Sequence, residues 1–426
     1  MKLPKFISNN LILKITSLNA SVIGIRLIVS LGVQRLLAVT VGESGVAALG
    51  QIRNVMNMLS SISTLGVFNG IVKYLSEFKQ DEATLVKLFS ASFFLSLIGT
   101  LVSGVALFFG AEFISQYLFN SLEYTFIFKL LAIIVPSIGL NRIFYGVING
   151  LSAYKTYAKI DLATYLLSAL FLVICLINYK IEGLLIAVIL APIIQLIVIL
   201  VLYKKTLSQY ITFKKLTLNF SFTNRLLAFT VMSFVSTFLI NYIELDIRTL
   251  ITRQLNIAEA GYWTAMTFIS KNYMVFATGL FTLYVLPRFA EIKTETAFKT
   301  EVLSIYKTIL PIFGVGMVLV YVFRDFIIEI IYPDFTGMTT LFKWQLLGDF
   351  IRLCSLVLAH QFIAKKMVKT FVFTEIISLG LFYIFSQLLI GPYGTEGVVI
   401  AHFLRYIIYL IVVIGAVKYY FVKQDT

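Results

Sequence analysis

Charged residues are scarce in this sequence, and that scarcity sets its class. Asp, Glu, Lys and Arg make up 13% of the 426 residues, whereas 59% are hydrophobic. A soluble chain of this length could not bury so much apolar surface. The hydrophobic runs are roughly 20 residues long, the length that lets a helix cross a bilayer core of about 30 Å. The sequence therefore predicts a multi-pass membrane protein.

Residues that usually carry chemistry are also few. Histidine and cysteine occur twice each, as His360, His402, Cys175 and Cys354, and their spacing is typical of neither a metal site nor a disulfide framework. No glycine-rich loop ends in Gly-Lys-Ser or Gly-Lys-Thr, and no local motif suggests a Ser/His/Asp constellation. We expect no metal, no cofactor and no enzymatic activity, and we expect both cysteines to fill small apolar spaces.

Three short segments recur about 215 residues further along the chain. Residues 182–187 (EGLLIA) reappear at 396–401 (EGVVIA), residues 155–157 reappear at 369–371, and Glu43 with Gly45 reappears as Glu259 with Gly261. The offsets of 214, 214 and 216 residues share one register. The chain is therefore predicted to consist of two related halves.

Twelve apolar runs are long enough to cross a bilayer as helices. They lie near residues 16–39, 46–72, 88–110, 126–150, 157–178, 183–203, 226–250, 262–287, 304–323, 340–364, 370–390 and 397–420. Because each half holds six runs, the two halves share one orientation in the membrane. We expect an all-α polytopic fold of two pseudo-symmetric six-helix lobes, at residues 1–206 and 226–426, joined by a cytoplasmic linker at 207–225.

Lysine and arginine are shared unevenly between the loops. The set of alternate loops that includes both chain ends and residues 204–215 carries most of them, while the opposite loops hold little beyond Lys180, Arg253 and Arg324. Under the positive-inside rule, both termini are expected in the cytoplasm. This topology and the attraction of anionic lipid account for much of the net charge of +14, so nucleic acid is not an expected partner.

Four of the expected helices carry polar residues along one face. The sets are Asn19, Arg26, Ser30 and Gln34; Asn54, Asn57, Ser61 and Thr64; Ser233, Thr237, Asn241, Glu244 and Arg248; and Thr267, Lys271 and Thr278. The repeat relates helix one to helix seven and helix two to helix eight, which favours a shared water-filled central cavity. The alternative interpretation is that Ser, Thr and Asn only join neighbouring helices.

Charged residues near the middle of the expected helices are mostly positive: Arg26, Arg142, Lys271, Arg352 and Arg405, against Asp349. An ionised side chain at a helix centre costs about 2.5–3.5 kcal/mol on insertion scales, so each needs a partner or water. Asp349 is spaced to pair with Arg352, and Arg142 with Asp161 on the next helix. Arg26 and Lys271 have no evident partner on their own helices and are the main candidates for substrate contact.

Three further arginines, Arg35, Arg53 and Arg248, lie nearer the helix ends, where snorkelling to the interface is the alternative explanation. Arg35 lies about 180° around the helix from Arg26, so both cannot face one cavity in a straight helix. An excess of fixed positive charge favours an anionic solute, and the planar fork of arginine suits phosphate.

Several short segments match a known family, and residues 324–365 are the most specific. They are Arg35-Leu36-Leu37-Ala38-Val39 with Arg26 and Gly42, Phe68-Asn69-Gly70, Tyr284-Val285-Leu286-Pro287, Arg324-Asp325-Phe326, Trp344-Gln345-Leu346, Gly348-Asp349 and Ile363-Ala364-Lys365. In these segments the chain resembles the Wzx-type flippases of O-antigen and enterobacterial common antigen synthesis, within the multidrug/oligosaccharidyl-lipid/polysaccharide exporter superfamily. The resemblance covers essentially the whole chain.

The resemblance implies a MATE-like fold in the bacterial inner membrane. The implied cargo is a polyprenyl-pyrophosphate-linked oligosaccharide, such as an O-antigen repeat unit, carried from the cytoplasmic to the periplasmic leaflet by alternating access through a cationic central cavity. Other membrane proteins of polysaccharide assembly are candidate partners. Lys271 departs from the family pattern, because an acidic residue stands at that position in the relative compared. The candidate substrate-binding residues are Arg26, Arg35, Arg53, Arg142, Arg248, Lys271 and Arg352.

Asp349, His360 and Glu375 are candidates for ion coupling or for structural pairing. Alternative functions remain open. A multidrug or cation antiporter of the same superfamily is disfavoured by Arg26, which stands where a buried acid is expected. A lipid II flippase would be expected to have two further helices. A membrane glycan polymerase is disfavoured by short outer loops without clustered acidic residues.

Overall fold

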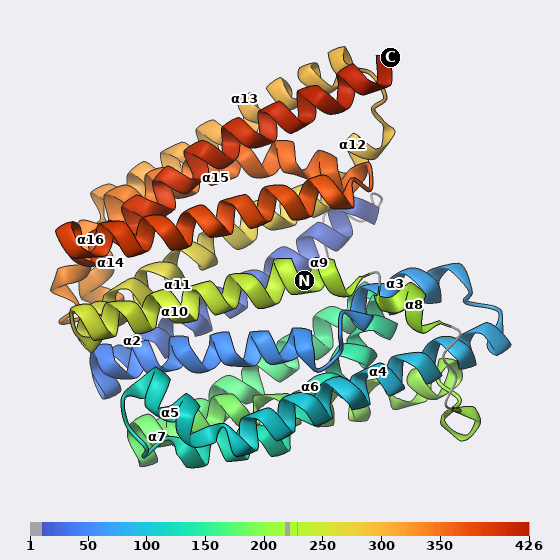
Figure 1. Cartoon of the computed structure of the whole chain (residues 1–426), viewed down its shortest axis with the longest axis horizontal. Coiled ribbons are helices and arrows are strands. Elements are labelled where there is room, and N and C mark those ends of the chain that lie inside the picture. Colours follow the sequence, from blue (N-terminus) through green and yellow to red (C-terminus); the bar gives the residue numbers. More distant parts are fainter. Residues whose placement is uncertain (1–10, 218–221, 228, 426) are drawn as a thin grey trace. The chain divides into compact units, whose positions relative to one another are not determined.

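The structure, a computed structural model, describes residues 11–217, 222–227 and 229–425, and almost all of these residues are helical (Figure 1). No strand occurs in these three ranges. The α-helices are α2 (Leu11–Ile62), α3 (Val67–Glu77), α4 (Glu82–Phe109), α5 (Ala111–Phe119), α6 (Thr125–Gly150), α7 (Tyr154–Tyr210), α8 (Thr223–Leu227), α9 (Thr230–Ser233), α10 (Ile240–Gln254), α11 (Ile257–Leu280), α12 (Leu286–Glu291), α13 (Glu295–Val322), α14 (Arg324–Ile331), α15 (Leu341–Ala364) and α16 (Val368–Asp425). Short 3-10 or π-helical segments are η1 (Phe213–Lys215), η2 (Phe234–Leu239), η3 (Phe281–Val285) and η4 (Thr336–Thr340).

Eight helical stretches of the described residues are long and apolar enough to cross a membrane. Three of them, in α2, α7 and α16, leave helical geometry at Gly42, Lys180 and Gly394, so each consists of two helices that meet at a corner. α11, continued by η3 and α12, supplies the remaining span. Each of the twelve expected spans is therefore occupied by helix, and the all-α expectation is confirmed.

The expected span at 46–72 is not one continuous helix. α2 ends at Ile62 and α3 begins at Val67, because Leu65 and Gly66 between them adopt positive φ values of 45° and 74°. A Cβ at Gly66 would lie 2.8 Å from Cα of Thr230. The Thr230 hydroxyl donates a 2.5 Å hydrogen bond to the carbonyl of Leu65. The turn is therefore stabilised by the close approach of α9, which hydropathy does not predict.

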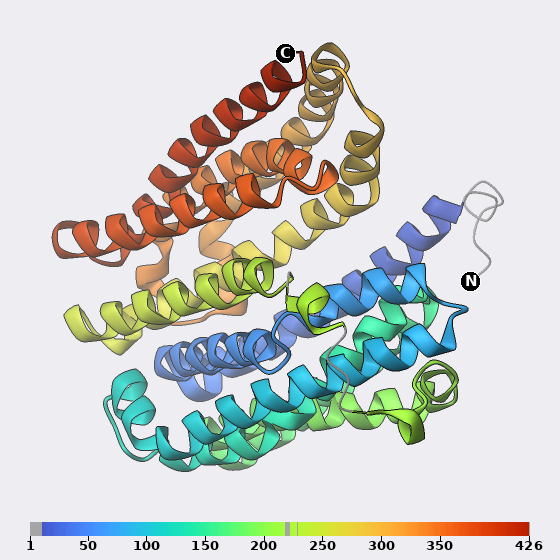
Figure 2. The same cartoon turned by 45° about the vertical axis from the view of Figure 1, so that its right-hand side comes forward.

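The chain divides into two compact units. The N-terminal unit comprises Met1–Thr40 and Ala48–Leu245, and the C-terminal unit comprises Val41–Ala47 and Asp246–Thr426. In the N-terminal unit, α4, α6 and α7 lie side by side and share an apolar core with α3 (Figure 2). In the C-terminal unit, α15 packs along α16. The division falls within α10, so this helix begins in one unit and ends in the other.

The corners in α7 and α16 repeat at the spacing of the sequence repeat. Lys180 (φ 48°) and Gly394 (φ 58°) are 214 residues apart. Three residues after each corner stands a glycine, Gly183 or Gly397. A Cβ on these glycines would lie 2.1 Å from the carbonyl oxygen of Cys175 and 2.2 Å from that of Leu389, respectively. The glycine of the Glu-Gly pair that begins each repeated segment is thus explained by close backbone contact across a tight corner, which leaves no room for a Cβ.

Gly397→Ala is expected to destabilise the protein, because its Cβ would meet the Leu389 carbonyl at 2.2 Å. Overpacking of this kind typically costs about 1–3 kcal/mol. Gly391→Ala is the matched control on the same helix, since no atom lies within 4 Å of its Cβ position; it is expected to be neutral or to stabilise by up to about 1 kcal/mol. The thermal unfolding midpoint of the purified protein in detergent measures both. Equal midpoints for the two variants would contradict this account of the corner.

Candidate functional site

Two adjoining cavities lie inside the N-terminal unit. They share Met56 and Asn57 of the second segment of α2, and their volumes are about 370 and 330 Å³. Small-molecule sites usually have volumes of about 300–1,000 Å³, so both cavities are large enough to hold part of a ligand. We name them after their arginines: the Arg53 cavity and the Arg142 cavity.

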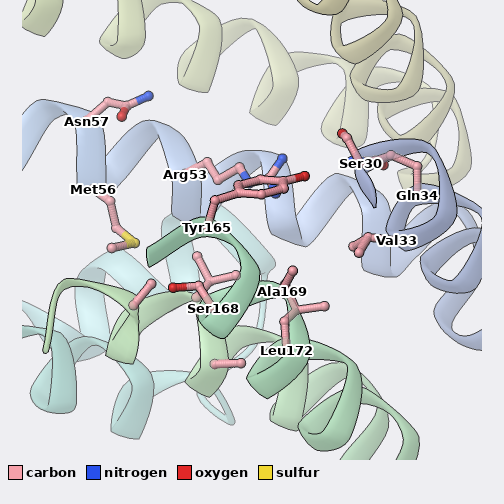
Figure 3. A pocket seen from close by; sticks show the side chains of 13 residues that line it. Ser30, Val33, Gln34, Arg53, Met56, Asn57, Tyr165, Ser168, Ala169 and Leu172 are labelled. Carbon is pink, nitrogen blue, oxygen red and sulfur yellow. The ribbon is translucent and has the colours of Figure 1, made fainter. Parts of the chain in front are cut away.

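The Arg53 cavity is enclosed by both segments of α2 and by α7 (Figure 3). Ser30 and Gln34 come from the first segment of α2, Arg53 comes from the second, and Tyr165 and Ser168 come from α7. Most of the remaining lining is apolar: Val33, Met56, Ala169, Leu172, Ala187, Val188 and Ala191. Among the described residues that line this cavity, Arg53 alone is charged. The cavity therefore presents one cation within apolar surroundings.

The Arg142 cavity is more polar and contains both signs of charge. Arg142 comes from α6 and Asp161 from α7. The guanidinium carbon of Arg142 lies 4.3 Å from the ring centre of Phe68, a cation–π contact. Amide, hydroxyl and phenol groups supply most of the other lining: Asn57, Ser60, Asn141, Asn149, Gln195, Tyr145 and Tyr157. Hydrogen-bond donors, acceptors and aromatic rings are thus gathered in one space.

Arg26 forms an ion pair at the edge of both cavities. Its Nη1 lies 2.6 Å from Oδ2 of Asp161, which lines the Arg142 cavity. Its guanidinium lies 4.9 Å from the ring centre of Tyr165, which lines the Arg53 cavity. The Tyr165 hydroxyl also donates to the Arg26 carbonyl at 3.1 Å. The side chains of Arg26 and Asp161 are 42% and 25% exposed, so the pair remains accessible.

The expected pairing of Asp161 with Arg142 is therefore wrong, since the Asp161 carboxylate binds Arg26. The reason is that α7 approaches the first segment of α2 at this point, where Tyr165 bonds the α2 backbone. Arg142 instead stacks on Phe68 and shares only the cavity with Asp161.

Residues of the polar stripes have two roles: some join neighbouring helices by hydrogen bonds, and others line the cavities. Ser61 bonds Ser233 of α9 at 3.1 Å, and Asn54 donates to the carbonyl of Asn241 of α10 at 3.2 Å, so these residues join α2 to α9 and α10. Asn57 does both, because it lines both cavities and donates to Oδ1 of Asn241 at 3.1 Å. Ser30, Gln34 and Arg53 line the Arg53 cavity. The side chains of Asn19 and Thr278 lie outside the described part of the structure.

The other cationic candidates occupy different surroundings. Arg248 is 2% exposed; its Nε donates to Thr264 at 2.7 Å and its guanidinium lies 5.1 Å from the Trp263 ring centre, so it does not snorkel. Arg35 and Lys271 are exposed. Neither the two arginines, Arg248 and Arg35, nor Lys271 belongs to the described lining of the Arg53 cavity or of the Arg142 cavity.

Asp349 lies at the centre of a buried network in the C-terminal unit. It is 0% exposed and accepts hydrogen bonds from Ser270 at 2.5 Å, from Gln345 at 3.2 Å and from Tyr273. Its carboxylate also lies 3.0 Å from Nε2 of His402 and 3.9 Å from Arg352. The expected Asp349–Arg352 pair is therefore present, within a larger set that sequence reasoning did not assemble.

The other two candidates for ion coupling lie apart from this network. His360 Nδ1 is 2.6 Å from the carbonyl of Leu356, four residues back on its own helix. Glu375 accepts a 2.7 Å hydrogen bond from Tyr409. No group of three His, Cys, Asp or Glu residues suited to a metal ion occurs among the described residues.

Sequence reasoning missed most of the uncharged lining of the Arg142 cavity, including Asn141, Tyr157 and Gln195. A signal for Tyr157 exists, because it ends the repeated Lys155-Thr156-Tyr157 segment whose counterpart ends in Phe371. Asn141 and Gln195 are amides within long apolar helices, a placement that marks buried hydrogen bonding or a wet cavity.

Comparison with solved structures defines the class of the fold. The chain is similar to an inward-facing MATE family multidrug resistance transporter of the MOP superfamily, with a TM-score of 0.73, 14% identity and coverage of 92% of this chain and 94% of that one. It is equally similar to the lipid II flippase MurJ in an inward closed conformation, with a TM-score of 0.73, 17% identity and coverage of 94% and 87%. The fold is thus the MATE-like arrangement of twelve membrane-spanning helices in two six-helix lobes, as expected.

The family follows from the sequence. Residues 12–293 match the model of the polysaccharide biosynthesis protein family, and the chain belongs to this family. Over 381 residues the chain is 25% identical to the lipid III flippase of Escherichia coli (strain K12) and to that of Shigella flexneri, covering 88% of this chain and 91% of each relative. These matches agree with the resemblance found in the short segments.

Proposed function

We propose that this protein is a flippase for a polyprenyl-pyrophosphate-linked oligosaccharide and not an enzyme. The observation that carries the proposal is the charge of the two cavities in the N-terminal unit. Their lining holds two arginines, Arg53 and Arg142, against one carboxylate, Asp161, which Arg26 already neutralises. Such a site stabilises an anion, and arginine suits the pyrophosphate because it binds two oxygens at once.

The comparisons support the same cargo. The curated relatives are named lipid III flippases, and one similar structure is a lipid II flippase. A cation antiporter of this fold would need a negative site, which the Arg53 cavity does not offer in its described lining. The cationic cavities thus favour a lipid-linked anion over a lipophilic cation.

The proposal includes a topology and a mode of transport. The protein would lie in the bacterial inner membrane with both termini in the cytoplasm, as the distribution of lysine and arginine favours. Lobes at residues 1–206 and 226–426, joined at 207–225, would expose the cationic site to each side in turn while the polyprenyl tail stays in lipid. Arg35, Arg248, Lys271 and Arg352 would add positive charge along the path, and other proteins of polysaccharide assembly are candidate partners.

Complementation tests the function. Expression in a bacterium that lacks its lipid-linked oligosaccharide flippase should restore surface polysaccharide and clear the lipid-linked intermediate from the cytoplasmic leaflet. Export of a cationic drug without restored glycan would favour the antiporter. Extension of a glycan polymer by the purified protein would establish the polymerase instead.

Arg26 is expected to bind the substrate as well as to pair with Asp161. Arg26→Ala should abolish surface glycan at unchanged membrane abundance, and Arg26→Lys should retain part of it, because a lysine keeps the charge but not the two-oxygen fork. Asp161→Ala alone should retain part of the display. The double variant removes both charges of the pair and should remain inactive. If the double variant displayed as much glycan as Asp161→Ala, Arg26 would serve only to neutralise Asp161.

A further inference from the structure

Building on the proposed function, we propose that the Arg142 cavity is a sugar subsite, which receives the sugar ring nearest the pyrophosphate, while the Arg53 cavity receives the pyrophosphate itself. The linings of the two cavities lead to this assignment. The Arg142 cavity holds a carboxylate, an arginine, amides and aromatic rings, whereas the Arg53 cavity holds one arginine in a mostly apolar lining. The side chain of Asn141 is held in place, since its amide nitrogen donates to the Pro192 carbonyl at 2.7 Å.

The chemistry of the Arg142 cavity suits hydroxyl groups better than phosphate. Phosphate oxygens only accept hydrogen bonds, and the Asp161 carboxylate in this lining is itself an acceptor with negative charge. Sugar hydroxyls both donate and accept, so they match the carboxylate and the amide, phenol and guanidinium groups of this lining together. The described lining of the Arg53 cavity contains no carboxylate, which makes it the better place for the anion.

Aromatic rings complete the subsite. The Tyr157 ring lines the cavity and meets Tyr145 edge-on, with ring centres 5.4 Å apart and an angle of 83° between the ring planes. This contact holds Tyr157 in place from one side. The C–H face of a pyranose packs against an aromatic ring as other apolar surfaces do. Tyr157 is therefore the residue that we expect to stack on the sugar.

The two cavities adjoin in the order that the ligand requires. They share Met56 and Asn57, so a pyrophosphate bound near Arg53 would place its attached sugar toward Arg142. Asn57 lines both cavities, so it would lie where the pyrophosphate of the ligand is joined to the sugar. The pyrophosphate would thus occupy the Arg53 cavity, which is largely apolar apart from its arginine, and the sugar would occupy the amide-rich Arg142 cavity beside it.

Binding of two lipids to the purified full-length protein in nanodiscs tests the assignment. The probes are polyprenyl pyrophosphate and the same lipid bearing one hexose. Wild-type protein should bind the hexose-bearing lipid about tenfold more tightly than the bare lipid. Tyr157→Leu and Asn141→Ala should each lose most of that gain and bind the bare lipid within twofold of wild type. Tyr154→Leu, at an exposed tyrosine of the same helix that lines neither cavity, should bind both lipids as wild type does, whereas Arg53→Ala should weaken both lipids alike.

Three other outcomes would overturn the assignment, and each has a different meaning. If wild-type protein binds both lipids equally, the sugar subsite is absent although the proposed function stands. If Tyr157→Leu and Asn141→Ala weaken both lipids equally, the Arg142 cavity holds the pyrophosphate or only supports the fold. If wild-type protein binds neither lipid, the proposed function and the subsite fail together.

Discussion

Replacing Arg53 with alanine is expected to abolish glycan display at the cell surface while the protein remains abundant in the membrane. Arg53 is the charged residue in the described lining of the Arg53 cavity, where Ser30 and Gln34 add hydrogen-bonding groups. Loss of two charge-assisted hydrogen bonds to a pyrophosphate would remove about 3 kcal/mol or more of binding, equivalent to at least roughly 100-fold in Kd. Surface polysaccharide in a flippase-deficient strain, normalised to protein abundance, measures the effect.

Two further variants show whether the loss of display is caused by the loss of the Arg53 guanidinium. Arg53→Lys keeps the charge but loses the planar fork, so it should restore part of the display. Arg324→Ala removes a partly exposed arginine that bonds the Tyr321 carbonyl at 2.8 Å and lies outside both cavities, so display should be unchanged. Full display by Arg53→Ala would remove the Arg53 cavity from the transport path and would contradict its assignment as the pyrophosphate site.

Asp349→Ala is expected to cause a large loss of stability. The carboxylate is fully buried and accepts from Ser270, Tyr273 and Gln345 while facing His402 and Arg352. Removing one partner of a buried charge pair typically costs about 3–5 kcal/mol, because the remaining charge stays buried without compensation. We therefore expect low membrane abundance and a clearly lowered thermal midpoint. Loss of display should follow the loss of protein.

The control for Asp349→Ala is a substitution at Asp325, an exposed carboxylate of the same unit that pairs with Arg324. Asp325 lies 3.7 Å from Arg324 and is 69% exposed, so Asp325→Ala should change stability by no more than about 1 kcal/mol. Asp349→Asn separates structure from ion coupling. If that variant is as abundant and as heat-stable as wild type but transports nothing, Asp349 takes part in coupling and the structural account is wrong.

Hydropathy and the internal repeat predicted the fold because both are local or periodic signals. A bilayer requires a run of about 20 apolar residues for each helix, so spans can be read directly from the sequence. The corners at Lys180 and Gly394 fall at the repeat offset of 214 residues. The turn at Leu65 and Gly66 escaped prediction because contact with Thr230, far away in the sequence, stabilises it.

Site geometry was less predictable, since periodicity gives the face of a helix but not its neighbour. Asn54 and Arg53 are adjacent, yet Asn54 bonds the backbone at Asn241 while Arg53 lines a cavity. The partner of Arg26 is Asp161, 135 residues away. No pattern in the sequence distinguishes that pairing from one with Arg142. The charge rule for membrane helices found Asp349 but not its neighbour His402, because no sequence spacing relates two residues on different helices 53 positions apart.

The two corners also show which positions of the bend tolerate a side chain. Lys180 and Gly394 turn at the same register with different side chains, so the bend does not require glycine at the residue that turns. Gly183 and Gly397 stand beside carbonyls that leave no room for a side chain. The bend of both halves therefore depends on the neighbour that must be small and not on the identity of the residue that turns.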